Sequence, residues 1–374
     1  MLNNPRHDRF GYYQVGDQKF YNKVLALEYA TRIGQFPTWN YNNQVFTSVD
    51  WTHDLPFSLK DAYRMRAEQL REKYDYLVLF YSGGVDSHNI LTTFLENNIK
   101  IDSVVVFGIF EFDHDRDLPI NLEQYKVAIP VAQKYQDQFE VNVLDLSRYL
   151  ERCYHQDWIY DSGTLLYPME LVRNMAWLDP SIQKWLDKGT TGLIKGIDKP
   201  RVIFENGRFY FGFLDTLVGD VVVSSLIDGK HAICDSLEPF YWTPDAPWLV
   251  AKQCQVIKNY IKNVRPDWLE NLYHFKKPTP DFMQNCVAPI IYDLGISPGS
   301  PPNYFTLGKS FDSPIWNIKD GFFHTDNQGQ LVSQKYWTQG INHLQSSLDP
   351  KFINDGQIKN GLMGFWSQWH DLGP

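Results

Sequence analysis

One stretch, residues 76–97, constrains the fold more than any other part of the chain. It reads Y-L-V-L-F-Y, then S-G-G-V-D-S, then H-N-I-L-T-T-F-L-E-N. The first apolar run has the length of a strand, and apolar residues return at helical spacing after the two glycines. The sequence therefore predicts a strand, a glycine loop and a helix in direct succession.

The loop between this strand and this helix is typical of an anion site. Gly83 and Gly84 allow positive φ and the close approach of a ligand, and the helix presents unpaired N–H groups at its positive dipole end. Ser82 and Ser87 add a hydroxyl group on either side of the glycines. Phosphate is the usual anion at such a junction. The alternative is a tight turn that binds no ligand.

Asp86 follows the two glycines and places a carboxylate beside the expected phosphate oxygens. The two anions would repel each other unless a divalent cation lay between them. We therefore interpret Asp86 as a Mg²⁺ ligand.

Strands and helices continue to alternate after this loop. Residues 101–107 and 141–146 read as strands, and residues 122–132 between them read as a helix. Such alternation indicates βαβ units and a parallel sheet, whose ligands bind at the carboxyl ends of the strands. Ser82, Phe107 and Asp145 would all lie at that edge.

The residues Ser82–Ser87 resemble the pyrophosphate loop of the N-type ATP pyrophosphatases. This superfamily includes the synthetase domain of asparagine synthetase, GMP synthetase and several tRNA-modifying enzymes. The resemblance is greatest to the asparagine synthetase domain and covers about residues 74–200. It implies a five-stranded parallel sheet, Rossmann-like and of the HUP type, with helices on both faces. It also implies that the loop, Val85 included, grips the phosphates of ATP while a substrate is adenylated and pyrophosphate leaves.

The resemblance extends to the end of the second strand, V-F-G at 106–108. In the family the backbone at this position contacts adenine, so Phe107 and Gly108 are candidate adenine contacts. The alternative is a strand that simply ends in glycine.

A second phosphate and metal motif of the family corresponds to K-G-I-D-K-P-R at 195–201. The sequence of this motif departs from the asparagine synthetase pattern. The resemblance implies Gly196 as a phosphate contact and Asp198 as a second Mg²⁺ ligand. It also implies Lys199 or Lys195 as the catalytic cation beside the phosphates. The alternative is a solvated turn with ordinary surface charges.

The chain divides into three segments. Residues 1–73 read as an N-terminal α+β extension, residues 74–265 as the ATP pyrophosphatase domain, and residues 266–374 as an irregular, loop-rich C-terminal extension. An Asn-Gly pair at 206–207 predicts a β-hairpin within an insertion at about 202–235.

Short-range signals predict further elements outside the sheet. They are a hairpin around 16–17, a helix over 24–33, extended structure over 36–46 with a turn at Asn42-Asn43, a helix capped by Ser58, and a helix capped by Asp245.

Composition limits the functions that fit. The chain has 374 residues, 43% of them hydrophobic, and a net charge of −9, which argues against a general nucleic-acid coat. No apolar run reaches the roughly 18 residues of a membrane helix, and the N-terminus has no apolar signal core. We therefore expect a cytoplasmic protein without a membrane partner.

The cysteines do not predict a zinc site, because the four of them are scattered and no C-x-x-C pair occurs. A thiol that relays sulfur in a thiolation reaction stays open for Cys153 or Cys254. Leu2, where an asparagine synthetase of the glutamine-hydrolysing type has cysteine, does not support a glutaminase function.

The expected function is that of an ATP-dependent ligase with ATP and Mg²⁺ as cofactors. It would adenylate a carboxylate, amide or carbonyl oxygen of a small molecule or nucleobase, and an amine or ammonia would then displace AMP. Two alternatives remain: a tRNA or nucleobase thiolation enzyme, although the charge does not favour nucleic acid, and a non-catalytic adenine-nucleotide-binding module. The aromatic-rich ends of the chain are compatible with a lid, a docking surface or a homo-oligomer interface.

Overall fold

A computed structural model of the chain describes residues 5–113, 121–149, 158–161, 176–196, 199–215, 226–227, 230–231, 236–272, 282–292, 297–298, 332–354 and 361–374. Within these ranges, every helix is too short or too polar to cross a membrane.

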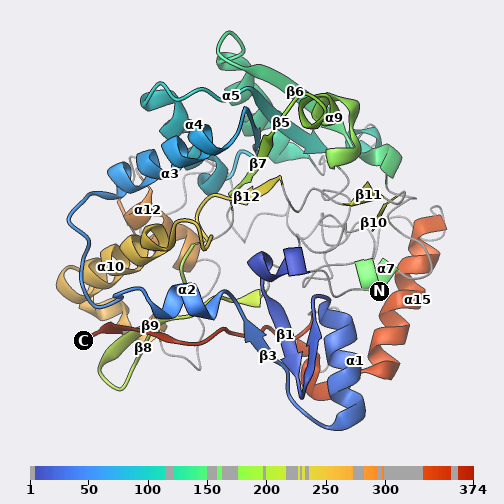
Figure 1. Cartoon of the computed structure of the whole chain (residues 1–374), viewed down its shortest axis with the longest axis vertical. Helices are drawn as coiled ribbons and strands as arrows, with labels where there is room; N and C mark the ends of the chain where they lie inside the picture. The colour runs from blue at the N-terminus through green and yellow to red at the C-terminus, as the bar shows by residue number, and fades with distance from the viewer. Residues whose placement is uncertain are drawn as a thin grey trace.

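A five-stranded parallel sheet occupies the upper half of the molecule in Figure 1. Its strand order is β12-β7-β4-β5-β6, with the bounds β4 (Tyr76–Phe80), β5 (Ser103–Gly108), β6 (Glu140–Asp145), β7 (Thr191–Lys195) and β12 (Leu237–Pro239). The chain builds outward from β4 to β6 and then crosses back to place β7 and β12 on the other side of β4. This doubly wound order is Rossmann-like, and it creates a topological switch point between β4 and β7.

Helices cover the central strands of the sheet, which explains why β4 is so apolar. Figure 1 shows α4 (Val85–Glu96) and α3 (Leu59–Lys73) on one side and α9 (Pro180–Leu186) on the other. Leu77, Val78 and Leu79 of β4 have no exposed surface. A continuous apolar run is expected of a strand that is buried on both faces.

In the lower half of the molecule, elements from the N-terminal and C-terminal parts of the chain lie together (Figure 1). Strands β1 (Tyr12–Val15), β2 (Gln18–Phe20) and β3 (Thr38–Asn40) form one antiparallel sheet in the order β2-β1-β3. A second sheet, β13-β9-β8, pairs the hairpin β8 (Val202–Glu205) and β9 (Arg208–Phe211) with β13 (His370–Gly373) near the C-terminus. One hydrophobic core runs through both halves.

The other described helices and strands are α1 (Lys23–Ile33), α2 (Asn43–Thr47), α5 (Ile129–Lys134), α7 (Trp158–Asp161), α10 (Pro247–Asn263), α12 (Ala288–Ile291), α15 (Val332–Ser347), β10 (Leu226–Ile227) and β11 (Lys230–His231). Short stretches of 3₁₀ or π helix lie before or between these elements, among them Pro5–Phe10, Gln124–Ala128 and Met283–Val287.

Most of the local predictions are confirmed. Gly34 ends α1 in the left-handed conformation (φ 70°). Ser58 caps α3 in a reciprocal capping box with Asp61. Asn206 and Gly207 turn the β8–β9 hairpin with φ values of 51° and 78°. The helix expected over 122–132 is present, with a π-helical turn at Gln124–Ala128 that lies directly before α5 and its Pro130.

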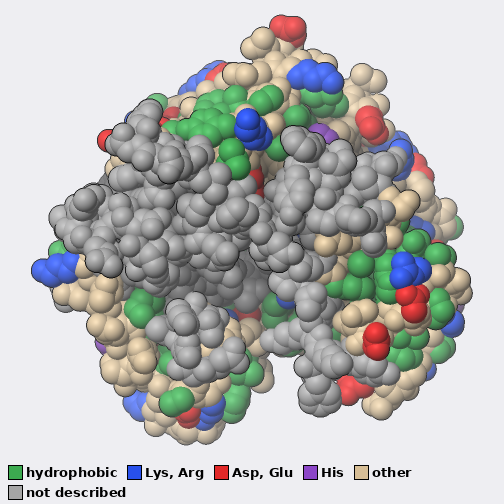
Figure 2. Space-filling view, turned by 180° about the vertical axis from the view of Figure 1, so that it is seen from behind, with side chains coloured by type: hydrophobic (Ala, Val, Ile, Leu, Met, Phe, Trp, Pro, Cys, Tyr) green, Lys and Arg blue, Asp and Glu red, His purple; other side chains and the backbone are tan. Residues whose placement is uncertain are grey.

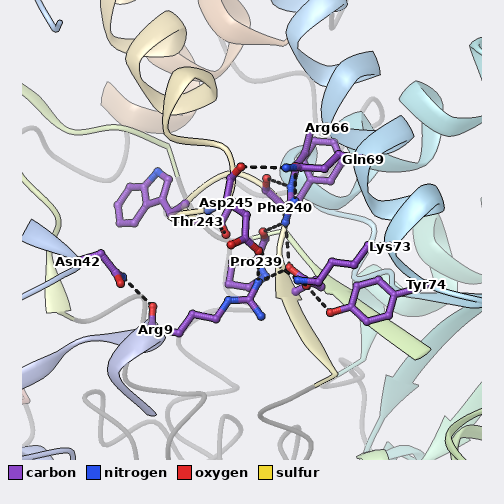
Figure 3. Close-up of polar contacts among 12 residues, drawn as sticks. Arg9, Asn42, Arg66, Gln69, Lys73, Tyr74, Pro239, Phe240, Thr243 and Asp245 are labelled. Atoms are coloured by element: carbon purple, nitrogen blue, oxygen red, sulfur yellow. Dashed lines mark hydrogen bonds and ion pairs between the residues drawn. The ribbon is translucent and has the colours of Figure 1, made fainter. Parts of the chain in front are cut away.

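Three predictions are wrong in detail. The turn expected at Asn42-Asn43 is present, with Asn42 at φ 47°, but extended structure over 36–46 is found only at β3, because the chain continues from the turn as α2. Asp245 does not cap α10, whose N-cap is Ala246 without a side-chain bond. The Asp245 carboxylate instead accepts hydrogen bonds from Arg9 (3.0 Å) and Lys73 (3.2 Å), as Figure 3 shows. The C-terminal segment holds the sixteen-residue helix α15, which its loop-rich composition did not predict.

Candidate functional site

The loop at 82–87 has the geometry expected of a phosphate-binding turn. Strand β4 ends at Phe80, and α4 begins at Val85 with Gly84 as its N-cap. Gly84 brings no side chain to the first N–H groups of the helix, so the N-cap residue does not compete with a ligand for them. Ser82 Oγ lies 3.2 Å from Ser87 Oγ, and Ser87 Oγ donates to the Gly84 carbonyl at 3.1 Å. The two serine hydroxyls thus hold the loop closed from both ends.

Glycine is required at position 83 for two reasons. Its φ of +76° lies in the left-handed region, which disfavours a side chain. A Cβ atom there would also lie 3.1 Å from the Ala128 backbone nitrogen, at the junction that leads into α5. The loop is therefore packed against the helix that follows β5.

The segment after β7 meets this loop at the switch point. A Cβ atom on Gly196 would lie 3.1 Å from the Ser87 nitrogen and 3.2 Å from the Asp86 carbonyl carbon. A side chain at position 196 would therefore crowd the first turn of α4. The structure thus places Gly196, which belongs to the motif expected at 195–201, against the loop at 82–87.

Lys199 pairs with Asp86 across this junction. Its Nζ donates to both carboxylate oxygens at 2.9 Å. The lysine is buried, with 4% of its surface exposed, and 23% of the Asp86 side chain is exposed. An ammonium ion therefore neutralises the carboxylate that lies in the first turn of α4.

Two tyrosines from later in the chain complete the surroundings of Asp86. Tyr292, directly after α12, donates its hydroxyl to Asp86 Oδ1 at 2.7 Å. Tyr241 donates to the Asp86 carbonyl oxygen at 2.8 Å and accepts from Asn89 at 2.9 Å. Burial, and then the nearby Asp86 carboxylate, raise the pKa of Tyr292 well above its usual value, so the phenol stays protonated and donates. Sequence reasoning missed both tyrosines.

The described residues do not form a magnesium cage at this point. Both oxygens of Asp86 already accept from Lys199, and Oδ1 accepts from Tyr292 as well. Mg²⁺ prefers several oxygen ligands in octahedral geometry. No group of three His, Cys, Asp or Glu side chains suited to a metal occurs in the part of the chain that the structure describes. Asp198, the expected second ligand, lies outside the described residues, so its role stays a prediction.

The end of β5 offers a structural reason for its glycine. A Cβ atom on Gly108 would lie 2.4 Å from Asn121 Oδ1, which accepts a hydrogen bond from the Ile109 nitrogen at 3.1 Å. Phe107 is partly buried, with its ring 5.8 Å from that of Phe80. Both residues lie at the carboxyl edge of the sheet as expected, and contact with adenine stays a prediction.

The remaining candidates have different positions. Lys195 is the last residue of β7, and its carbonyl accepts from the Phe240 nitrogen at 3.0 Å. Cys254 has no exposed surface, and burial raises the pKa of its thiol well above the usual value. A thiol of this kind is a poor nucleophile, which argues against a sulfur relay at Cys254. Cys153 lies outside the described residues.

Comparison with models of known protein families finds no match, and no curated protein matches the sequence.

Proposed function

We propose that this chain is an ATP-dependent enzyme that adenylates a carboxylate, amide or carbonyl oxygen and releases pyrophosphate. The observation that carries the proposal is the meeting of two strand-end segments at the switch point of the sheet. Gly83 and Gly196 make that meeting possible, and Lys199 lies beside it. Ligands of doubly wound sheets bind at this position. We also assign the sheet to the HUP type, on the strength of the strand order and of the loop that follows its first strand.

The proposed roles follow from the positions of the residues. Backbone N–H groups of the loop from Gly83 to Ser87 would receive the β and γ phosphates, with the hydroxyl groups of Ser82 and Ser87 closing it. Lys199 would stabilise the negative charge of the departing pyrophosphate. Lys195, at the end of β7, would be a second cation beside the phosphates. Mg²⁺ enters the proposal only as part of the substrate, the magnesium complex of ATP.

Adenylation converts a poor leaving group into a good one, because AMP leaves far more easily than an oxide ion. An amine or ammonia would then attack the activated carbon, and the product would be an amide or amidine. The acceptor is thus a small molecule or a nucleobase with an oxygen to be activated.

Transfer RNA is less favoured as the acceptor. The net charge is −9, and the face shown in Figure 2 carries Lys and Arg side chains interspersed with Asp and Glu among the described residues. Nucleic-acid-binding proteins gather basic side chains on one face. The buried thiol of Cys254 also argues against thiolation at that residue.

Exchange of labelled pyrophosphate into ATP tests the proposal. We expect exchange in the wild type that depends on one compound from a panel of carboxylic acids, amino acids and nucleobases. Ser87→Ala removes a hydroxyl that spans the loop and should lower the exchange rate at least about 10-fold. Thr93→Val is the matched control, because it removes another buried hydroxyl from α4 that bonds only within the helix.

Two results would contradict the proposal. ATP binding without exchange under every condition would favour a non-catalytic nucleotide-binding module. Equal loss of exchange in Ser87→Ala and Thr93→Val would show that the loop hydroxyl has no special role.

A further inference from the structure

The contact between Asp86 and Lys199 has a consequence for how the loop binds phosphate. A carboxylate in the first turn of α4 would repel phosphate oxygens, and a cation is needed between them. The structure supplies one from the chain itself, because Lys199 Nζ lies 2.9 Å from both oxygens of Asp86. The physical reason for placing a metal on Asp86 is therefore already met by an ammonium ion.

The ammonium is bonded to a carboxylate that is itself held in place. Asp86 bonds it with both oxygens, and Tyr292 fixes the carboxylate by donating to Oδ1 at 2.7 Å. The backbone next to Tyr292 is itself anchored, because the carbonyl oxygen of the preceding residue, Ile291, accepts a hydrogen bond from the hydroxyl of Tyr63 at 2.8 Å. Gln253 of α10 in turn donates to that hydroxyl at 3.1 Å.

Burial makes this arrangement costly to break. Lys199 is 4% exposed, Tyr292 is 2% exposed, and a buried ion that loses its partner is strongly destabilised. The pair is thus a fixed part of the site, whereas an exposed lysine would sample many positions and lose entropy on binding a ligand.

We propose that Lys199 is the resident cation of the phosphate loop, and that Asp86 and Tyr292 are positioning residues that hold its ammonium group. The nucleotide phosphates meet Lys199 at the loop, and no metal ion bound to Asp86 is needed for them to bind. This inference rests on the proposed function and concerns which cation the site uses.

The test is the equilibrium binding of ATP, measured by calorimetry in EDTA and again in Mg²⁺ without an acceptor. We expect the wild type to bind ATP in both. Lys199→Met should weaken binding in EDTA about 10- to 100-fold, the effect of losing a charge-assisted contact and exposing the Asp86 carboxylate to phosphate. Mg²⁺ should restore part of this loss, because the metal can replace the ammonium beside Asp86.

A double variant separates charge from packing. Asp86→Asn combined with Lys199→Met removes the repelling carboxylate together with the lysine, so it should bind ATP in EDTA more tightly than Lys199→Met alone. Tyr292→Phe should weaken binding in EDTA about 2- to 10-fold and have a smaller effect in Mg²⁺. Lys252→Met is the control, because it removes a buried lysine that bonds to Asp54 away from the loop.

The outcomes distinguish this inference from the function on which it rests. Wild-type binding that requires Mg²⁺ and is abolished by Asp86→Asn would identify Asp86 as a metal ligand and overturn the inference, while the proposed function would stand. A wild type that binds ATP neither in EDTA nor in Mg²⁺ would overturn both.

Discussion

The imidazole of His370 lies buried against the indole of Trp51, with the ring centroids 4.5 Å apart and the planes 17° from parallel. Its Nε2 has no hydrogen-bond partner among the described residues. Burial lowers the pKa of His370 from 6.5 to about 4, because protonation would place a charge among aromatic rings. The unfolded chain therefore binds the proton more tightly than the folded chain does.

This shift makes stability depend on pH in one direction. Above about pH 6.5 the titration of His370 does not change the free energy of unfolding. As the pH drops from there towards about 4, that free energy falls by up to about 3 kcal/mol. We expect His370→Phe to remove about 2 kcal/mol of the difference between pH 7.5 and pH 5, measured by urea unfolding. His53→Ala, at an exposed histidine, is the control. Equal pH dependence in wild type and His370→Phe would contradict this account.

At the scale of elements, strand β12 is held to helix α3 by a buried carboxylate. Glu238 has no exposed surface and accepts from Arg66 of α3 at 3.0 Å, from Lys73 at 2.8 Å, and from Arg9 and Tyr74. Figure 3 shows these side chains converging from the N-terminal turn and from α3. Burial alone would raise the pKa of Glu238, but Arg66 and Arg9 outweigh it and hold that pKa at about 2.

Removing this one carboxylate should destabilise the edge of the sheet. We expect Glu238→Gln to lower the free energy of unfolding by about 3 to 5 kcal/mol at pH 7, because Arg66 is left buried without its counter-ion. In the wild type, the stabilisation that the ionised Glu238 carboxylate provides should be lost as the pH falls from about 4.5 towards 2. Glu140→Gln breaks a partly exposed pair with Lys184 and should cost less than about 1 kcal/mol. Equal costs for the two variants in chemical unfolding would refute this ranking.

The whole molecule is joined by contacts between segments that are distant in sequence. Lys23 of α1 lies 2.8 Å from Asp215, and neither side chain is exposed. Asp215 also accepts from the Tyr13 hydroxyl at 2.7 Å and from the Phe365 nitrogen at 2.9 Å. One carboxylate thus connects the N-terminal elements, the segment after β9 and the C-terminal strand region.

We therefore expect Lys23→Met to destabilise the chain as a whole, by about 3 to 5 kcal/mol, because it leaves a buried carboxylate without its counter-ion. Adding Asp215→Asn should recover part of the loss. Lys19→Met is the control, since that lysine pairs with Asp8 at the partly exposed surface. Thermal unfolding followed by circular dichroism measures all three variants, and a double variant less stable than Lys23→Met would contradict the proposed cause.

The parts of the fold that the sequence predicted are those with local causes. The loop at 82–87, the capping box at Ser58 and the Asn206-Gly207 turn each depend on residues a few positions apart. The predicted helix cap at Asp245 was wrong because its carboxylate pairs with Arg9, which lies 236 positions away in the sequence.

The same limit applies to the candidate site. A resemblance to a known family, and no local signal, makes Gly196 and Lys199 candidates, and the structure places both against the first turn of α4. Tyr292 could not be found, because it lies 206 positions from Asp86 in a segment without a motif. The aromatic run around Tyr241 was visible in the sequence, but nothing local connected it to the loop.

The most direct test of the central claim is calorimetric titration with pyrophosphate of the wild type, Gly83→Ala and Gly207→Ala. Both glycines have positive φ, at 76° and 78°, but only position 83 is crowded by Ala128 and belongs to the loop. We predict that the wild type and Gly207→Ala bind pyrophosphate and that Gly83→Ala does not. Undiminished binding by Gly83→Ala would show that the phosphates bind somewhere other than the loop after β4.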